Sequence, residues 1–192
     1  MGNDIKIPIE VSAKHAHLCQ EHVDILFGKG YQLTNKAELS QKGYFVANER
    51  VEVVGSKSGA DFGILLPLRD KSQIEVAITD AIKLGLDIVL RDSGDLEGSG
   101  ACILRGPEGE IALSEGVIVA RRHIHMNDED AKQLGVKDKD HISVSVDGDR
   151  ALIFEDVLIR TDPTFSTSMH IDTDEGNAAN INNKTKSFGK RI

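Results

Sequence analysis

The chain has 192 residues, of which 40% are hydrophobic and 4% are aromatic. That is enough for one large domain or two small ones with modest cores. The formal net charge of −8 argues against nucleic acid or an anionic membrane as the main partner. The sequence has no apolar run long enough to span a bilayer and no signal peptide. With two cysteines, Cys19 and Cys102, and no Cys-x-x-Cys pair, we expect a reduced, intracellular protein without a cysteine zinc knuckle.

The first predicted element is a strand over residues 5–17. Apolar and polar residues alternate from Ile5 to Ser12, and this period of two continues in phase to His15 and His17. Residues i and i+2 of a strand project from the same side, so the two imidazoles can converge on one ion. If the alternation is unbroken, both rings lie on the apolar, inward face.

The same phrase recurs 108 positions later. The segments 11–18 (VSAKHAHL) and 119–126 (VARRHIHM) each contain His-x-His, and together they hold four of the seven histidines. A self-similar segment at a long period indicates two copies of one structural unit. The sequence therefore predicts an internal duplication in which each copy presents a pair of histidines.

A helix is predicted after each histidine pair. Residues 19–28 (CQEHVDILFG) and 127–135 (NDEDAKQLG) have apolar residues at helical spacing and end in a glycine suited to a C-cap. Asn127 is a predicted N-cap, followed by acidic residues that the helix dipole favours. Cys19 occupies the corresponding position of the first copy, where we favour a structural role over that of a nucleophile.

The remaining pattern is one of short strands, at residues 51–54, 62–68, 74–78, 88–90, 101–104, 111–113, 142–146, 151–154 and 157–159. Turn residues at 106–109 (GPEG) and 147–149 (DGD) join neighbouring runs as hairpins. Such closely spaced strands favour small barrels over an alternating β/α sheet. We predict two domains, 1–115 and 116–192, with exchange of strands between them left open, and a frayed tail at 180–192.

The histidines suggest a metal site. Neutral imidazoles with a carboxylate suit zinc, cobalt or nickel, and a zinc ion with three protein ligands keeps a position open for water or substrate. Four histidines cannot complete two such sites, and His170 is the best further candidate. His22 and His141 are interpreted as structural or surface residues. The acidic residues in 172–175 (DTDE) either orient metal-bound histidines or cap a helix.

Several motifs resemble those of a known family, the PduL-type phosphate acyltransferases. They are KHAHL at 14–18, LPLR at 66–69, SQIEV at 72–76, RDSG at 91–94, ARRHIHM at 120–126 and HIDTDEGNA at 170–178. They follow the family's order and cover nearly the whole chain. The resemblance implies a mainly β fold of two similar small β-barrel domains capped by short α-helices. It also implies an enzyme that interconverts a short-chain acyl-CoA (propanoyl-CoA or acetyl-CoA) plus phosphate with acyl phosphate plus CoA, as in propanediol degradation.

The resemblance also implies a two-metal site. One metal would be held by His15, His17 and Glu75, the other by His123, His125 and His170, and Arg69 would bind phosphate. From the residues alone, Glu75 lies in a predicted strand and Arg69 lies in a predicted loop. The planar guanidinium of Arg69 suits phosphate better than the ammonium group of a lysine would. The RDSG segment is interpreted as a polar turn without a catalytic residue. This chain has Leu66 where the family has Gly, which puts the geometry of the Arg69 loop in question.

The implied cofactors are two zinc ions, with cobalt or nickel as alternatives, and coenzyme A is a substrate. The expected partners are acyl-CoA and phosphate, without nucleic acid or membrane, and a homodimer is considered as the assembly. The first predicted strand begins within a few residues of Met1, which leaves no room for the microcompartment-targeting extension of some relatives, so we expect a cytoplasmic protein. Two other functions stay open: a metal-dependent hydrolase of acyl-CoA or a related ester, and a non-catalytic metal-binding protein.

Overall fold

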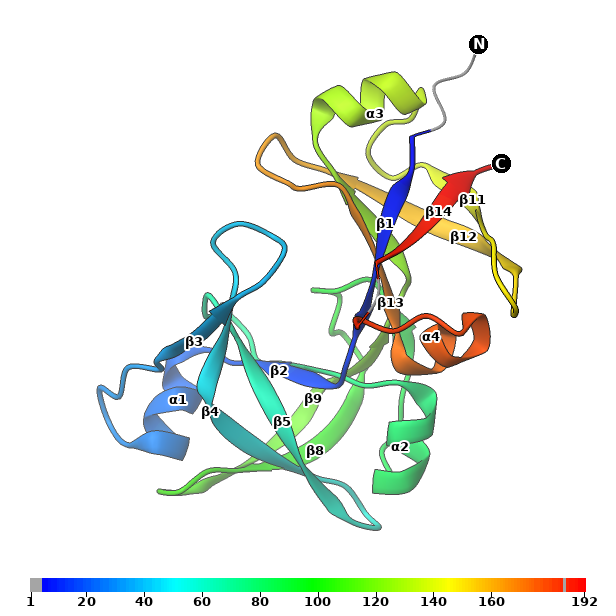
Figure 1. The fold of residues 1–192 in the computed structure, drawn as a ribbon. Coiled ribbons are helices and arrows are strands. Elements are labelled where there is room, and N and C mark those ends of the chain that lie inside the picture. The colour runs from blue at the N-terminus through cyan, green and yellow to red at the C-terminus, as the bar shows by residue number, and fades with distance from the viewer. Residues whose placement is uncertain (1–4, 185) are drawn as a thin grey trace. The chain divides into compact units, whose positions relative to one another are not determined.

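The computed structural model describes residues 5–184 and 186–192, which fall into two compact units (Figure 1). The N-terminal unit is Ala13–Ala120, and the C-terminal unit combines the residues up to Ser12 with Arg121–Ile192. Both are built mostly from strands with short helices, which confirms the predicted fold class. Within the described residues, every helix is too short or too polar to cross a membrane.

The C-terminal unit is a closed barrel. Its strands follow the order β1 (Ile7–Ser12), β13 (Ser168–Asp172), β10 (His123–Met126), β12 (Leu152–Thr161), β11 (His141–Val146) and β14 (Ser187–Arg191). Helix α3 (Asp128–Leu134) follows β10, and α4 (Thr173–Ala179) follows β13. Alternate strand residues fill the interior, including the fully buried Ile7, Ile124, Met126, Ile159 and Met169.

The N-terminal unit closes in the same way. Its ring of paired strands is β9 (Glu110–Ala120), β6 (Gln73–Glu75), β2 (His15–His17), β5 (Gly59–Leu66), β4 (Phe45–Val54) and β8 (Gly100–Arg105), which pairs again with β9. Strand β3 (Asn35–Glu38) pairs with β4, and β7 (Leu90–Arg91) pairs with β9. The helices are α1 (Gln20–Phe27) and α2 (Ile78–Leu84). The core includes Leu18, Leu26, Phe62, Ile64, Ile74 and Leu104.

The two barrels share one topology. Strand β2 runs parallel to β5 and antiparallel to β6, as β10 runs parallel to β12 and antiparallel to β13. Strand β9 runs parallel to β6 and antiparallel to β8, as β1 runs parallel to β13 and antiparallel to β14. The predicted duplication is therefore visible as a repeated six-stranded barrel.

The observed units differ from the predicted ranges 1–115 and 116–192. The strand that comes just before each histidine strand in the sequence belongs to the barrel of the other unit. The chain passes from one unit to the other at Ala13 and again at Arg121, which are 108 positions apart, like the two histidine pairs. Strand β1 precedes His15 but belongs to the C-terminal barrel, and β9 precedes His123 but belongs to the N-terminal barrel. The predicted strand over 5–17 is accordingly interrupted after Ser12.

The helix ends agree with the predicted caps. The side chain of Asn127 accepts the backbone N–H of Asp130 at 2.9 Å, and Gly135 ends α3 in the left-handed conformation. Cys19 is the N-cap residue of α1, but its side chain forms no capping bond. The hydroxyl of Ser72 instead accepts the backbone N–H of Cys19 at 3.0 Å. Cys19 therefore has the structural position that the sequence predicted.

Three local predictions were wrong. Residues 187–191, predicted as part of a frayed tail, form β14, which pairs with β1 and β11 and closes the barrel. Residues 151–154 and 157–159, predicted as two strands, lie almost entirely in the single strand β12. The strand predicted over 74–78 ends at Glu75, because α2 begins at Ile78. In each case pairing with a distant strand or the start of a helix sets the boundary, and a local pattern does not contain that information.

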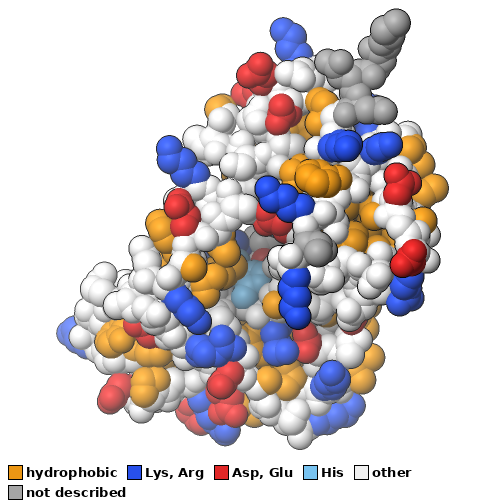
Figure 2. Space-filling view, viewed as in Figure 1, with side chains coloured by type: hydrophobic (Ala, Val, Ile, Leu, Met, Phe, Trp, Pro, Cys, Tyr) orange, Lys and Arg blue, Asp and Glu red, His pale blue; other side chains and the backbone are white. Residues whose placement is uncertain are grey.

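Figure 2 shows one face of the molecule, on which acidic, basic and hydrophobic side chains are interspersed.

Candidate metal centres

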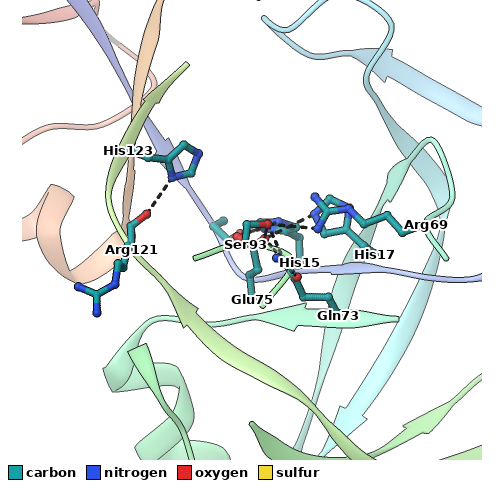
Figure 3. A network of polar contacts seen from close by, with 10 residues as sticks. His15, His17, Arg69, Gln73, Glu75, Ser93, Arg121 and His123 are labelled. Atoms are coloured by element: carbon teal, nitrogen blue, oxygen red, sulfur yellow. Dashed lines mark hydrogen bonds and ion pairs between the residues drawn. The ribbon is translucent and has the colours of Figure 1, made fainter. Parts of the chain in front are cut away.

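The first candidate centre lies in the N-terminal unit, where β2 pairs with β6. This pairing places His15 directly opposite Glu75. The distance from His15 Nε2 to Glu75 Oε2 is 3.4 Å, and that from His17 Nε2 to Glu75 Oε1 is 3.6 Å (Figure 3). The candidate ligand atoms of these three residues all lie within 4.8 Å of one another, the one such group among residues 5–184 and 186–192. Two imidazoles and a carboxylate form a donor set that suits zinc.

Burial sets the charge states in this centre. His15 is 7% exposed and His17 is 4% exposed. Burial lowers the pKa of His17 to about 4, even though its hydrogen bond with Glu75 raises it, so this ring is neutral at pH 7. Burial also disfavours protonated His15, but the Glu75 carboxylate outweighs that effect and the His15 pKa is raised. Burial would raise the pKa of Glu75, but the charge of His15 and the histidine hydrogen bonds hold it well below its usual value. The carboxylate is therefore ionised, as metal ligation requires.

A backbone contact orients the first histidine. The Nδ1 atom of His15 lies 2.8 Å from the carbonyl oxygen of Ala13. Because a carbonyl can only accept, Nδ1 carries a proton, and the lone pair of the neutral ring is on Nε2, the atom that faces Glu75. Such backbone contacts are typical of metal-binding histidines.

The second candidate centre lies in the C-terminal unit, where β10 pairs with β13. His123 stands directly opposite His170 in this pairing. The ring centroids are 4.8 Å apart for His123 and His125, 4.9 Å for His125 and His170, and 5.3 Å for His123 and His170. His123 Nδ1 lies 2.8 Å from the carbonyl oxygen of Arg121 (Figure 3). Three half-buried imidazoles thus gather at one place on the barrel.

The two centres are built on the same plan. In each unit the third candidate ligand, Glu75 or His170, stands opposite the first histidine of the pair. In each centre, Nδ1 of that first histidine also contacts the backbone carbonyl oxygen of the residue two positions earlier. The duplication therefore preserves the backbone framework of the centre, while the residue that completes the ligand set differs between the copies.

Arg69 lies in the loop between β5 and β6. Its backbone N–H donates to the carbonyl of Leu18 at 2.9 Å, which ties the loop to the end of β2. Its guanidinium Nη1 donates to the hydroxyl of Ser93 at 3.1 Å (Figure 3). The positive charge of Arg69 is also among the causes that lower the pKa of His17. The structure thus brings Arg69 to the first candidate centre.

Two residues of this centre were not predicted from the sequence. Gln73 Nε2 donates to Glu75 Oε1 at 2.5 Å and to Ser93 Oγ at 2.9 Å, and Ser93 Oγ donates to Glu75 Oε1 at 3.0 Å. Ser93 belongs to the RDSG segment, which was interpreted as a turn without a catalytic residue. A signal for Gln73 was present, because residues 73 and 75 share one face of a strand.

The other candidates have structural roles. His22 Nδ1 lies 2.7 Å from Ser72 Oγ, and the exposed His141 has its Nδ1 2.7 Å from Asp156 Oδ1. Asp172 and Glu175 form a capping box at the start of α4. The acidic cluster at 172–175 therefore caps a helix, which was one of its two predicted roles.

Comparison with known proteins identifies the family. The family model described as phosphate propanoyltransferase matches residues 8–182. A phosphate propanoyltransferase of Lachnoclostridium phytofermentans is 53% identical over 177 residues, which cover 91% of this chain and 83% of the relative. Those of Thermotoga maritima and Listeria monocytogenes are 48% and 45% identical, over 92% and 90% of this chain and 85% and 81% of the relatives. The chain therefore belongs to the phosphate propanoyltransferase family of acyltransferase enzymes.

Proposed function

We propose that this chain transfers the acyl group of propanoyl-CoA or acetyl-CoA to inorganic phosphate and also catalyses the reverse reaction. The observation that carries the proposal is the buried cluster of His15, His17 and Glu75 with Arg69 next to it, in a chain of this family. A Lewis-acid site suits a thioester substrate, and a nearby guanidinium suits a phosphate. These are the two reactants of the proposed transfer.

We further propose two metal centres, one in each unit, that bind zinc, with cobalt or nickel as alternatives. His15, His17 and Glu75 would hold one ion, and His123, His125 and His170 the other. Three protein ligands leave a coordination position open to substrate. Bound zinc would supply a Lewis acid that stabilises negative charge on the thioester oxygen and on the departing thiolate.

The residues of the chain position the second reactant. The planar guanidinium of Arg69 matches two phosphate oxygens and can direct a third at the thioester carbon. A bond then forms between that oxygen and the acyl carbon, the carbon–sulfur bond breaks, and CoA leaves as the thiolate. Holding the reactants in this geometry converts an encounter in solution into a positioned attack. The scheme needs no covalent acyl-enzyme, so Cys19 has no part in it.

The test is to measure CoA release from acetyl-CoA and propanoyl-CoA with and without phosphate, before and after chelation, and again after zinc is restored. We expect release that requires phosphate, is lost on chelation and returns with zinc. Release that does not depend on phosphate would instead indicate a hydrolase. A rate that survives complete chelation would contradict the metal centres, and bound metal without thiol release would indicate a non-catalytic metal-binding protein.

A further inference from the structure

The hydroxyl of Ser93 joins the two functional parts of the first candidate centre. Arg69 Nη1 donates to Ser93 Oγ at 3.1 Å, and Gln73 Nε2 donates to the same oxygen at 2.9 Å. The hydroxyl in turn donates to Glu75 Oε1 at 3.0 Å. One oxygen atom thus contacts both a proposed metal ligand and the proposed phosphate-binding arginine (Figure 3).

These three bonds use the full capacity of a serine hydroxyl, which has one donor and two acceptor positions. Their directions are fixed by chemistry, because a guanidinium and an amide NH₂ can only donate. Arg69 and Gln73 therefore occupy both acceptor positions of the hydroxyl, and its one proton is donated to Glu75 Oε1. Ser93 is therefore held in one orientation.

The amide of Gln73 is fixed in the same way. Its Oε1 accepts the backbone N–H of Gly94 at 2.8 Å, so its Nε2 must face Glu75 and Ser93. Gln73 is buried, and the bond to Gly94 ties the turn that carries Ser93 to strand β6. Gln73 and Ser93 each donate one hydrogen bond to Glu75 Oε1, while Glu75 Oε2 faces His15.

We propose that Ser93 is a positioning residue that sets both the orientation of the Glu75 carboxylate and the position of the Arg69 guanidinium. This inference rests on the proposed roles of Glu75 and Arg69, and it adds that metal affinity and phosphate affinity depend on one shared hydroxyl. Loss of that hydroxyl leaves Glu75 with one fewer donor and Arg69 with one fewer acceptor. Both affinities then fall together.

The test compares the wild type with Ser93→Ala, Ser93→Thr and the control Ser56→Ala. The control removes a hydroxyl of the same unit that donates to the carbonyl of Gly85 at 2.7 Å, away from the centre. Zinc affinity is measured by competition with a chromophoric chelator. Phosphate affinity is measured by calorimetry on protein loaded with stoichiometric zinc, and KM is measured for phosphate and for acetyl-CoA. Ser93→Gly, which also removes the hydroxyl and is compatible with a turn, serves if Ser93→Ala does not fold.

We expect Ser93→Ala to weaken zinc binding by roughly tenfold or more, as for other partners of metal ligands. The phosphate Kd and KM should rise by about three- to tenfold, with the KM for acetyl-CoA unchanged. Ser93→Thr, which keeps the hydroxyl, should restore both affinities, and Ser56→Ala should match the wild type. A change in only one affinity, or in neither, would overturn the shared role. If the wild type releases no CoA but both affinities still change, the proposed function fails and the positioning role stands.

Discussion

At the scale of single residues, burial and pairing produce the chemistry of the first centre. A buried carboxylate alone would tend to be protonated, and a buried imidazole alone would be neutral. The paired arrangement keeps Glu75 ionised and leaves His17 neutral at pH 7. Both are the states that a metal ion requires of its ligands.

Arg69 carries the first residue-scale prediction. We expect Arg69→Ala to raise the KM for phosphate by at least tenfold, because a charge-assisted contact with phosphate is lost. Bound metal should stay near the wild-type level, since Arg69 donates no electron pair. The control is Arg105→Ala, which removes an exposed arginine paired with Glu110. An unchanged phosphate KM, or metal loss equal to that of a histidine variant, would show that Arg69 does not bind phosphate.

Cys102 carries a pH-dependent prediction. Burial raises the pKa of this thiol from 9.0 to about 12. The folded state therefore keeps a proton that the unfolded chain releases above pH 9, so this group lowers the stability as the pH rises from about 9 to 12. Its contribution at pH 10 is a loss of about 1.4 kcal/mol.

The measurement is the free energy of urea unfolding at pH 8 and pH 10 for wild type and Cys102→Ala. The cavity left by the substitution lowers stability at both pH values, so it cancels in the difference between them. We expect the variant to lose about 1.4 kcal/mol less than the wild type over this range, because the thiol contributes almost nothing at pH 8. Equal losses in the two proteins would contradict the raised pKa.

At the scale of elements, a strand pair followed by a short helix is the repeated framework of each centre. Strands β2 and β6 in one barrel correspond to β10 and β13 in the other, with the candidate ligands at matching positions. Helices α1 and α3 follow the histidine strands, and the sequence predicted their N-cap positions, Cys19 and Asn127, of which only Asn127 caps with its side chain.

Asn127 carries the element-scale prediction. Its side chain accepts the N–H of Asp130 and satisfies one of the donors at the start of α3. We expect Asn127→Ala to lower the free energy of unfolding by about 1 kcal/mol, and Asn127→Ser, which keeps an acceptor, to lower it much less. Urea titration of the metal-free protein measures both. If the two variants lose the same free energy, the cap is not the source of the stability.

At the scale of the whole molecule, the sequence predicted the duplication, the β class and the histidine pairs, because these depend on local spacing. It did not predict where the units divide. The alternation that leads to His15 runs without a break through Ala13, so nothing local shows that β1 joins a different barrel from β2. Strand β14 was missed for a related reason, because its polar residues become a strand through pairing with β1 and β11.

The same difference between local and long-range information applies to the residues of the candidate centres. His15 and His17 could be found from spacing, whereas Glu75 and His170 gain meaning only from the strands opposite the histidines. For Glu75, resemblance to the family supplied what the local pattern lacked. His170 was named from the residues as a further candidate ligand, and the resemblance assigned it to the second histidine pair. Ser93 was dismissed because its role depends on Arg69, 24 positions earlier, and on Glu75, 18 positions earlier.

The central claim is that each copy of the repeat holds one metal ion. The most direct test is the number of zinc ions per chain, measured by native mass spectrometry. We expect two ions in the wild type and in the exposed-histidine control His141→Ala, and one in each of the double variants His15→Ala/His17→Ala and His123→Ala/His125→Ala. A wild type with fewer than two ions, or a double variant that still binds two, would contradict the claim.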